Sequence, residues 1–339
     1  MNICRLCLNN EADKTGSHMI PHFLMKMIDT VEGTAGRDKE LGFKLGTNEV
    51  GHYFGRSVQP EKLQEVFGEV TDEEIANSRS EVIIDHVFCS KCEDRLGKLE
   101  NNYAKTLGTS DNQKYMSTKE SLSTLMFWAS ILWRASVSGT LGIQLASKDE
   151  TKLREVLNTY MDLKVPAEEL KDIAVLDEIG YKIIRSPGFS EERKGFMFFN
   201  PHHRRPYCFL IGELAVFFYM KSSHLKDIGE SFFGLEKYLK DAETNTYLRG
   251  ESILPLPHDS FHNVNIQVAE FFANAWTKGV VFKLNGLYKL AGGRGRMPLP
   301  LTKEILNSIA SNERELGRKY TNEEVATVVT EIMSKYAQS

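Results

Sequence analysis

Four of the five cysteines stand in two Cys-x-x-Cys pairs, Cys4 with Cys7 and Cys89 with Cys92. Such a turn directs two thiolates at one ion, and two turns complete the tetrahedral, closed set of ligands that structural zinc takes. Residues 8–88 separate the pairs, whereas a compact zinc ribbon has roughly 15–20 residues there. A redox dithiol is the alternative for either pair, but no thioredoxin-like βαβ pattern surrounds them. We predict Zn²⁺ on these four cysteines, and a buried apolar role for the fifth, Cys208.

The residues around the two pairs follow a recognisable order. Residues 15–22 read Thr-Gly-Ser-His-Met-Ile-Pro-His, and residues 88–93 read Phe-Cys-Ser-Lys-Cys-Glu. The order is therefore Cys-x-x-Cys, then a polar residue with His18, two hydrophobic residues and a proline, then Cys-x-x-Cys followed by a polar residue of metal-ligand type. This order resembles the zinc-containing HNH endonucleases of the ββα-metal (treble-clef) class. The resemblance covers about the first 105 residues.

The resemblance implies roles for individual residues. His18 matches the family's general base, and a neutral imidazole with a pKa of about 6.5 suits proton abstraction at neutral pH. Ser17 stands where the family has an aspartate ligand of the catalytic ion, and Glu93 stands where it has His or Asn. The family's middle Asn has no match, and Asp85 and His86 lie at about its place. The implied catalytic ion is Mg²⁺ or Mn²⁺, for which Glu93 and Asp85 are suitable ligands.

The activity that the resemblance implies is metal-assisted hydrolysis of phosphodiester bonds. Similar variants occur in uncharacterised bacterial HNH-like proteins, some encoded near phage-defence genes, so a defence role is also implied. The alternative is a non-catalytic protein, stabilised by zinc, that binds nucleic acid or a partner protein. Ser17 and the missing Asn favour this alternative. In it, His18 supports the zinc knuckle through a hydrogen bond, and Glu93, Arg95 and Glu100 form ordinary salt bridges on a solvated helix.

Charge bears on the partner. The chain of 339 residues has 42 Lys and Arg against 46 Asp and Glu, a net charge of -4, which argues against coating nucleic acid through bulk charge. Residues 278–300 nevertheless contain only basic charges. We predict that this segment contacts a phosphate backbone, DNA more than RNA, through Lys283, Lys289, Arg294 and Arg296. A solvent-exposed basic loop is the alternative reading. Residues 202–205, His-His-Arg-Arg, are a second candidate contact.

The apolar segments predict no membrane helix. Residues 122–145 are the most apolar long stretch, and Arg134 interrupts them at mid-span, where an arginine in a bilayer is costly. A buried core helix is the better reading. The N-terminus has no apolar secretory signal. We therefore expect a cytoplasmic protein, in which reduced thiols favour metal over disulfides.

The remaining pattern predicts an α+β protein. We expect an HNH-like zinc module with a long insertion over 1–110, and a larger, helix-rich mixed domain over 111–339 that senses a ligand, binds a protein partner or binds nucleic acid. Strands are expected within 183–220, with a hairpin turn at 200–206, and short strands within 33–55. Helices are expected at 60–67, from Thr71, at 117–145, 148–163 and 264–276, and twice within 302–335, where Thr321 and Glu324 form a capping box.

Overall fold

A computed structural model describes residues 2–28, 41–45, 50–54, 82–107, 121–163, 167–170, 173–189, 196–200, 205–226, 228, 232–290, 292–316 and 320–338. The chain divides into two compact units. The first comprises Met1–Glu40 and Arg79–Gln267, and the second comprises Leu41–Ser78 and Val268–Ser339. Both helices and sheets occur, as expected of an α+β protein. The helices predicted at 60–67 and from Thr71 lie outside the described residues.

The first unit begins with the residues of the predicted zinc module. Strand β1 (Ser17–His18) pairs antiparallel with β4 (Ile83–Ile84), so that Ser17 faces Ile84 and His18 faces Ile83. The short helix α1 (His22–Met25) follows Pro21, whose fixed φ suits a helix start. Helix α4 (Ser90–Thr106) begins directly after Cys89 and buries one face through Cys92, Leu96, Leu99 and Tyr103.

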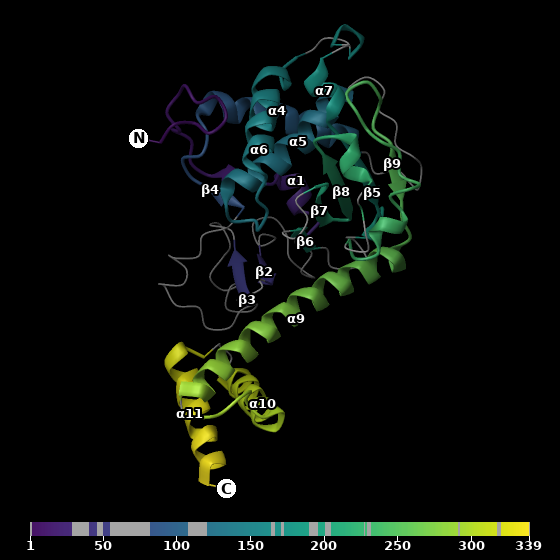
Figure 1. Cartoon of the computed structure of the whole chain (residues 1–339). Coiled ribbons are helices and arrows are strands. Elements are labelled where there is room, and N and C mark those ends of the chain that lie inside the picture. Colours follow the sequence, from purple (N-terminus) through teal and green to yellow (C-terminus); the bar gives the residue numbers. More distant parts are fainter. Residues whose placement is uncertain are drawn as a thin grey trace. The chain divides into compact units, whose positions relative to one another are not determined.

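Helix α5 (Ser121–Ser138) forms the centre of the first unit. Nearly every side chain from Ser121 to Ser136 is buried, including Trp128 and Trp133, so the predicted core helix is confirmed. Helices α4 and α6 (Ser147–Tyr160) lie beside it (Figure 1). Among the described residues, no helix is long and apolar enough to cross a membrane.

A five-stranded sheet completes the first unit, in the order β6-β7-β8-β5-β9. All neighbours are antiparallel except β5 and β9, which are parallel. Every residue of β7 and β8 is buried, Cys208 included, which explains their continuous apolar sequence. The predicted strands within 183–220 and the antiparallel pairing of β6 with β7 are thus confirmed, and residues 201–204 of the predicted turn lie outside the described residues. The bounds are β5 (Gly180–Arg185), β6 (Phe196–Phe199), β7 (Tyr207–Gly212), β8 (Leu214–Tyr219) and β9 (Ile253–Pro255).

Short helical segments also occur among the described residues of the first unit. They are η2 (Ala167–Leu170), α7 (Ala174–Glu178), η3 (Ser222–Leu225) and η4 (Leu235–Lys237).

The second unit contains a hairpin and a helical core. Strands β2 (Leu41–Leu45) and β3 (Val50–Phe54) pair antiparallel. Helix α9 (His258–Leu290) begins in the first unit and continues into the second, where α10 (Leu299–Leu316) and α11 (Asn322–Gln338) follow. The core of these helices comprises Leu284, Met297, Leu301, Ile305, Val329 and Ile332. The functional division predicted at residue 110 stays a prediction, and α4 and α5, on either side of it, both belong to the first unit.

Candidate metal centre

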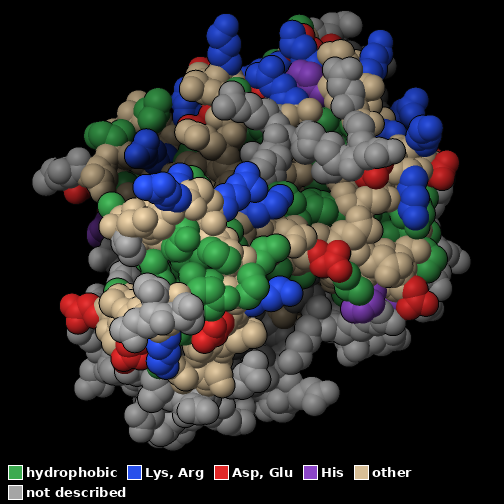
Figure 2. Space-filling model, turned by 60° about the horizontal axis from the view of Figure 1, so that its bottom comes forward, with side chains coloured by type: hydrophobic (Ala, Val, Ile, Leu, Met, Phe, Trp, Pro, Cys, Tyr) green, Lys and Arg blue, Asp and Glu red, His purple; other side chains and the backbone are tan. Residues whose placement is uncertain are grey.

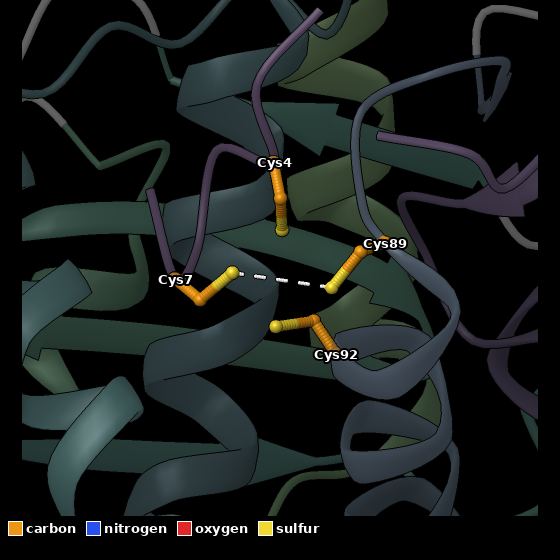
Figure 3. Close-up of side chains that lie close together, drawn as sticks. All are labelled: Cys4, Cys7, Cys89 and Cys92. Carbon is orange, nitrogen blue, oxygen red and sulfur yellow. Dashed lines mark hydrogen bonds between the residues drawn. The ribbon is translucent and has the colours of Figure 1, made fainter. Parts of the chain in front are cut away.

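The four cysteines of the two pairs come together. Their sulfur atoms all lie within 4.8 Å of one another, and the Sγ atoms of Cys7 and Cys89 are 3.9 Å apart. Figure 3 shows the four side chains directed at a common centre. Tetrahedral zinc with Zn–S bonds of about 2.3 Å requires sulfurs about 3.8 Å apart. The group can therefore hold a metal ion, and its thiol donors and spacing fit zinc.

Backbone hydrogen bonds shape the first knuckle. The amide of Leu8 donates to the carbonyl of Cys4 at 3.0 Å, and the amide of Cys4 donates to the carbonyl of Asn10 at 2.8 Å. Leu8 has a φ of 58°, a left-handed conformation that turns the chain back after the second cysteine. The Asn10 side chain donates towards Cys89 Sγ at 3.6 Å, so the first knuckle also supports a sulfur of the second pair.

The second pair lies at the start of α4. Cys89 is the N-cap residue, and Cys92 belongs to the first turn. The positive end of the helix dipole favours thiolates there, as a metal site requires. A hydrogen bond with Cys92 lowers the pKa of Cys4 to about 4, and the same bond raises the pKa of Cys92. The lowered pKa favours the thiolate at Cys4, which is the form of cysteine that binds a metal ion.

A polar cluster adjoins the cysteines. Ser17, which is 1% exposed, donates its hydroxyl proton to Glu93 Oε2 at 3.1 Å. Burial raises the pKa of Glu93, while the Ser17 hydrogen bond and the charge of Arg134 act in the opposite direction. The residue before His18 therefore contacts the residue after the second cysteine pair, and the resemblance to HNH endonucleases implies that both stand at ligand positions.

Arg134 of α5 joins this cluster from beyond the predicted module. Its side chain is 2% exposed, and Nη1 donates to the His18 carbonyl at 3.0 Å and pairs with Glu100 Oε1 at 2.5 Å. One guanidinium thus connects α5, β1 and α4. The sequence indicated Arg134 only as an interruption of an apolar stretch. A lone charged residue in a buried helix was the signal for such a partner, because a buried cation needs one.

His18 is half-buried at the end of β1. Its ring lies 6.3 Å from that of His22, centroid to centroid, in an edge-on arrangement. His22 opens α1 directly after Pro21. The imidazole rings of His18 and His22 therefore lie near each other.

Asp85 and His86 hold the backbone between the knuckles. Asp85 Oδ1 accepts from the Gly16 amide at 2.7 Å, and the His86 ring pairs through Nδ1 with the Ala12 carbonyl at 3.0 Å. His86 has a φ of 59°. Within the described part of the chain, the four cysteines are the one group of three or more His, Cys, Asp or Glu residues with converging ligand atoms. His18, Glu93, Asp85 and His86 form no second group of this kind there.

The other charged candidates lie at the surface. Arg95 pairs with Asp162 at 2.5 Å and donates to Asn158, the ordinary salt-bridge role considered for it. Lys283 and Lys289 are exposed on α9. Arg294 and Arg296 are exposed between α9 and α10. Of residues 202–205, only Arg205 is described, and it pairs with Asp149 at 2.8 Å.

Comparisons with protein-family models, with curated proteins and with solved structures find no match for this chain. Assignment of a function therefore rests on the chain's own residues and on the resemblance of its motifs.

Proposed function

We propose that the chain is a metal-dependent endonuclease of the HNH type, with structural zinc on Cys4, Cys7, Cys89 and Cys92. The contact between Ser17 and Glu93 carries the proposal. It brings strand β1, which carries His18, to the first turn of helix α4. In the HNH family the general base and the catalytic ion come together at the corresponding place. The order of elements supports the proposal further, because the first knuckle, the antiparallel strands β1 and β4, and helix α4 follow one another, an order typical of a treble clef with a long insertion between its strands.

In the proposed reaction, His18 takes a proton from a water molecule whose oxygen attacks phosphorus. The phosphodiester P–O bond then breaks, and the leaving oxygen gains a proton from solvent. Glu93, with Asp85 or His86, would hold Mg²⁺ or Mn²⁺. When bound, this ion supplies electrostatic stabilisation of the leaving oxygen. Arg134 holds the His18 backbone through the carbonyl, so the base sits on a fixed strand.

The test is a cleavage assay. Supercoiled plasmid, single-stranded DNA and RNA are incubated with the zinc-loaded protein and Mg²⁺ or Mn²⁺, beside His18→Ala. His262→Ala is the matched control, since His262 lies on α9 and has no role in the proposal. We expect cleavage by wild type and by the control, and a loss of about 100-fold or more in His18→Ala. Absence of cleavage with every substrate and ion would refute the nuclease, and cleavage that survives His18→Ala would refute the role of His18.

A second candidate function is a non-catalytic protein, stabilised by zinc, that binds nucleic acid or another protein. The hydrogen bonds of Asp85 and His86 to the backbone of residues 12–16 favour it, because they give both side chains a structural task. This candidate predicts nucleic-acid or protein binding with no cleavage in the same assay.

A role in bacterial defence against phages is part of the proposal and follows from the resemblance alone. Expression of wild type, but not of His18→Ala, would then lower the plating efficiency of phages on a bacterial host. Equal plating efficiency for both proteins across a phage panel would contradict this role.

A further inference from the structure

The second half of α9 has one buried and one exposed face. Leu284 belongs to the core of the second unit, and Val280 and Tyr288 pack against that core. On the exposed side, Phe282 is 80% and Leu290 is 86% exposed, and Leu299 at the start of α10 is 75% exposed. Large apolar side chains exposed to this degree and close together in the chain are typical of a binding surface. We call Phe282, Leu290, Leu299 and the cations of residues 278–303 the α9–α10 surface.

The apolar residues of this surface lie between lysines. At about 100° per residue, Phe282 and Leu290 are separated by about 80° around the helix axis. Lys289 then lies about 20° outside Phe282 on one side, and Lys283 about 20° outside Leu290 on the other. On the face seen in Figure 2, hydrophobic side chains gather with Lys and Arg side chains near them.

The charged residues of this segment of the chain all have one sign. Residues 271–303 contain no Asp or Glu, and they include Lys278, Lys283, Lys289, Arg294, Arg296 and Lys303. A second copy docked face to face through this surface would bring like charges together, which disfavours self-association. Charge complementarity therefore points to an anionic partner, and the exposed Phe and Leu side chains require that it also offer apolar area.

The turn after α9 suits close approach of a phosphate. Gly292 has a φ of 90° and Gly295 a φ of 77°, and nothing lies within 4 Å of where a Cβ would stand at either. These glycines lie on either side of Arg294, and Gly295 directly precedes Arg296; both arginines are exposed. Arginine binds phosphate through two parallel hydrogen bonds, and glycine lets the backbone come near it.

We propose that the α9–α10 surface binds single-stranded nucleic acid. The cations track the phosphates, an unpaired base stacks on Phe282, and Leu290 and Leu299 cover apolar base faces. In a duplex the base faces are stacked inside, so these side chains would meet only phosphate and sugar, whereas a single strand offers both phosphates and base faces. The inference rests on the proposed function in that it names the nucleic acid which the nuclease engages, but the binding is measurable without cleavage.

The test is fluorescence anisotropy of the full chain with a labelled 20-nucleotide oligo(dT) and with a 20-base-pair duplex, without added divalent ions, across a salt series. We expect tighter binding to the single strand. Phe282→Ala should weaken it by about tenfold, and Lys289→Gln should make the salt dependence shallower by about one phosphate contact. The matched controls are Leu248→Ala, an exposed leucine of the first unit, and Lys148→Gln, an exposed lysine on α6. Both should bind as wild type.

Three outcomes would overturn the inference. They are no binding of oligo(dT) at low salt, unchanged affinity in Phe282→Ala, and equal affinity for the duplex. Flotation with vesicles of phosphatidylglycerol and phosphatidylcholine addresses the other anionic partner, and vesicle binding lost in Phe282→Ala with no oligonucleotide binding would also overturn it. Binding of oligo(dT) by a protein that cleaves nothing would refute the nuclease and support the surface. Cleavage by a protein whose binding of oligo(dT) does not depend on Phe282 would support the nuclease and refute the role of the α9–α10 surface.

Discussion

Arg134 donates a hydrogen bond from Nη1 to the backbone carbonyl of His18 at 3.0 Å, from a helix that begins more than a hundred residues later in the chain. The same nitrogen forms an ion pair with Glu100 of helix α4. The strand that carries the proposed base is therefore held by α5 as well as by its pairing with β4. The two cysteine knuckles alone do not account for the environment of His18, and an isolated piece ending near residue 110 would lack the support of Arg134.

Replacing Arg134 by Gln should destabilise the first unit by about 2–3 kcal/mol, because the Glu100 carboxylate and the His18 carbonyl lose a charged donor. Arg134→Lys keeps the charge but loses the planar set of guanidinium donors, so its free energy of unfolding should lie between those of wild type and Arg134→Gln. Urea unfolding followed by tryptophan fluorescence measures both. The matched control is Arg154→Gln, whose partner Glu155 is largely exposed, so a change below about 0.5 kcal/mol is expected. Equal stability of Arg134→Gln and wild type would show that the contacts of Arg134 with His18 and Glu100 do not stabilise the first unit.

Removing one thiolate should empty the metal site. We expect one zinc per chain in wild type, and a clear loss of zinc and a lower melting temperature in Cys89→Ser, since a structural zinc contributes directly to folding. Metal content is measured by mass spectrometry after gel filtration. Cys208→Ala is the control, because Cys208 lies in β7 and not in the cluster, and it should keep its zinc. Full zinc content in Cys89→Ser would refute the four-thiolate site.

Ser17→Asp tests the departure from the HNH pattern. The hydroxyl now donates to Glu93, so an aspartate there places two carboxylates at hydrogen-bonding distance in a buried site. Like charges so close repel unless a cation or a proton lies between them. We expect a lower melting temperature for Ser17→Asp, restored by millimolar Mn²⁺ to a greater degree than in wild type. Ser17→Ala loses one hydrogen bond and should show no added response to the ion. A response to Mn²⁺ shared by Ser17→Asp and Ser17→Ala would argue against ligation at this position.

The sequence predicted best what is local. The two cysteine turns, the buried core helix and the box of Thr321 and Glu324 each depend on residues a few positions apart. Helix α9 extends to 258–290, beyond the predicted 264–276, because packing of Leu284 outweighs the cost of about 1 kcal/mol for each glycine in its interior. The parallel pairing of β9 with β5 depends on contacts between distant segments, which carry no local pattern.

The capping box at the start of α11 gives a local prediction. The Thr321 amide donates to Glu324 Oε2 at 2.7 Å, and the Glu324 amide donates to Thr321 Oγ1 at 3.3 Å. Thr321→Ala should cost about 1 kcal/mol, seen as faster hydrogen exchange in the first turn of α11. Thr321→Ser retains the hydroxyl and should exchange nearly as wild type. Unchanged exchange in Thr321→Ala would show that the box contributes nothing.

Glu251 predicts a pH dependence of stability. The side chain is 1% exposed and accepts hydrogen bonds from Tyr103 Oη, Trp128 Nε1 and Tyr181 Oη, at 2.9, 2.8 and 2.7 Å for the shortest contact of each. These donors come from α4, α5 and β5, so Glu251 lies where two helices meet the five-stranded sheet. Burial raises the pKa of Glu251 above its ordinary value in spite of these bonds.

Because the pKa of Glu251 is raised in the folded state, the stability that this residue contributes must fall as pH rises. The neutral acid favours folding, so its contribution is complete below the unfolded pKa of about 4.3 and is lost as pH rises through the folded value. Glu251→Gln stays neutral at every pH. Its free energy of unfolding, measured in urea at pH 5 and pH 8, should therefore rise relative to wild type with pH. Glu155→Gln, at an exposed site, should follow wild type at both. The opposite trend, in which wild type becomes more stable relative to Glu251→Gln as pH rises, would contradict the prediction. It would show that the three hydrogen-bond donors outweigh the effect of burial and keep the carboxylate ionised.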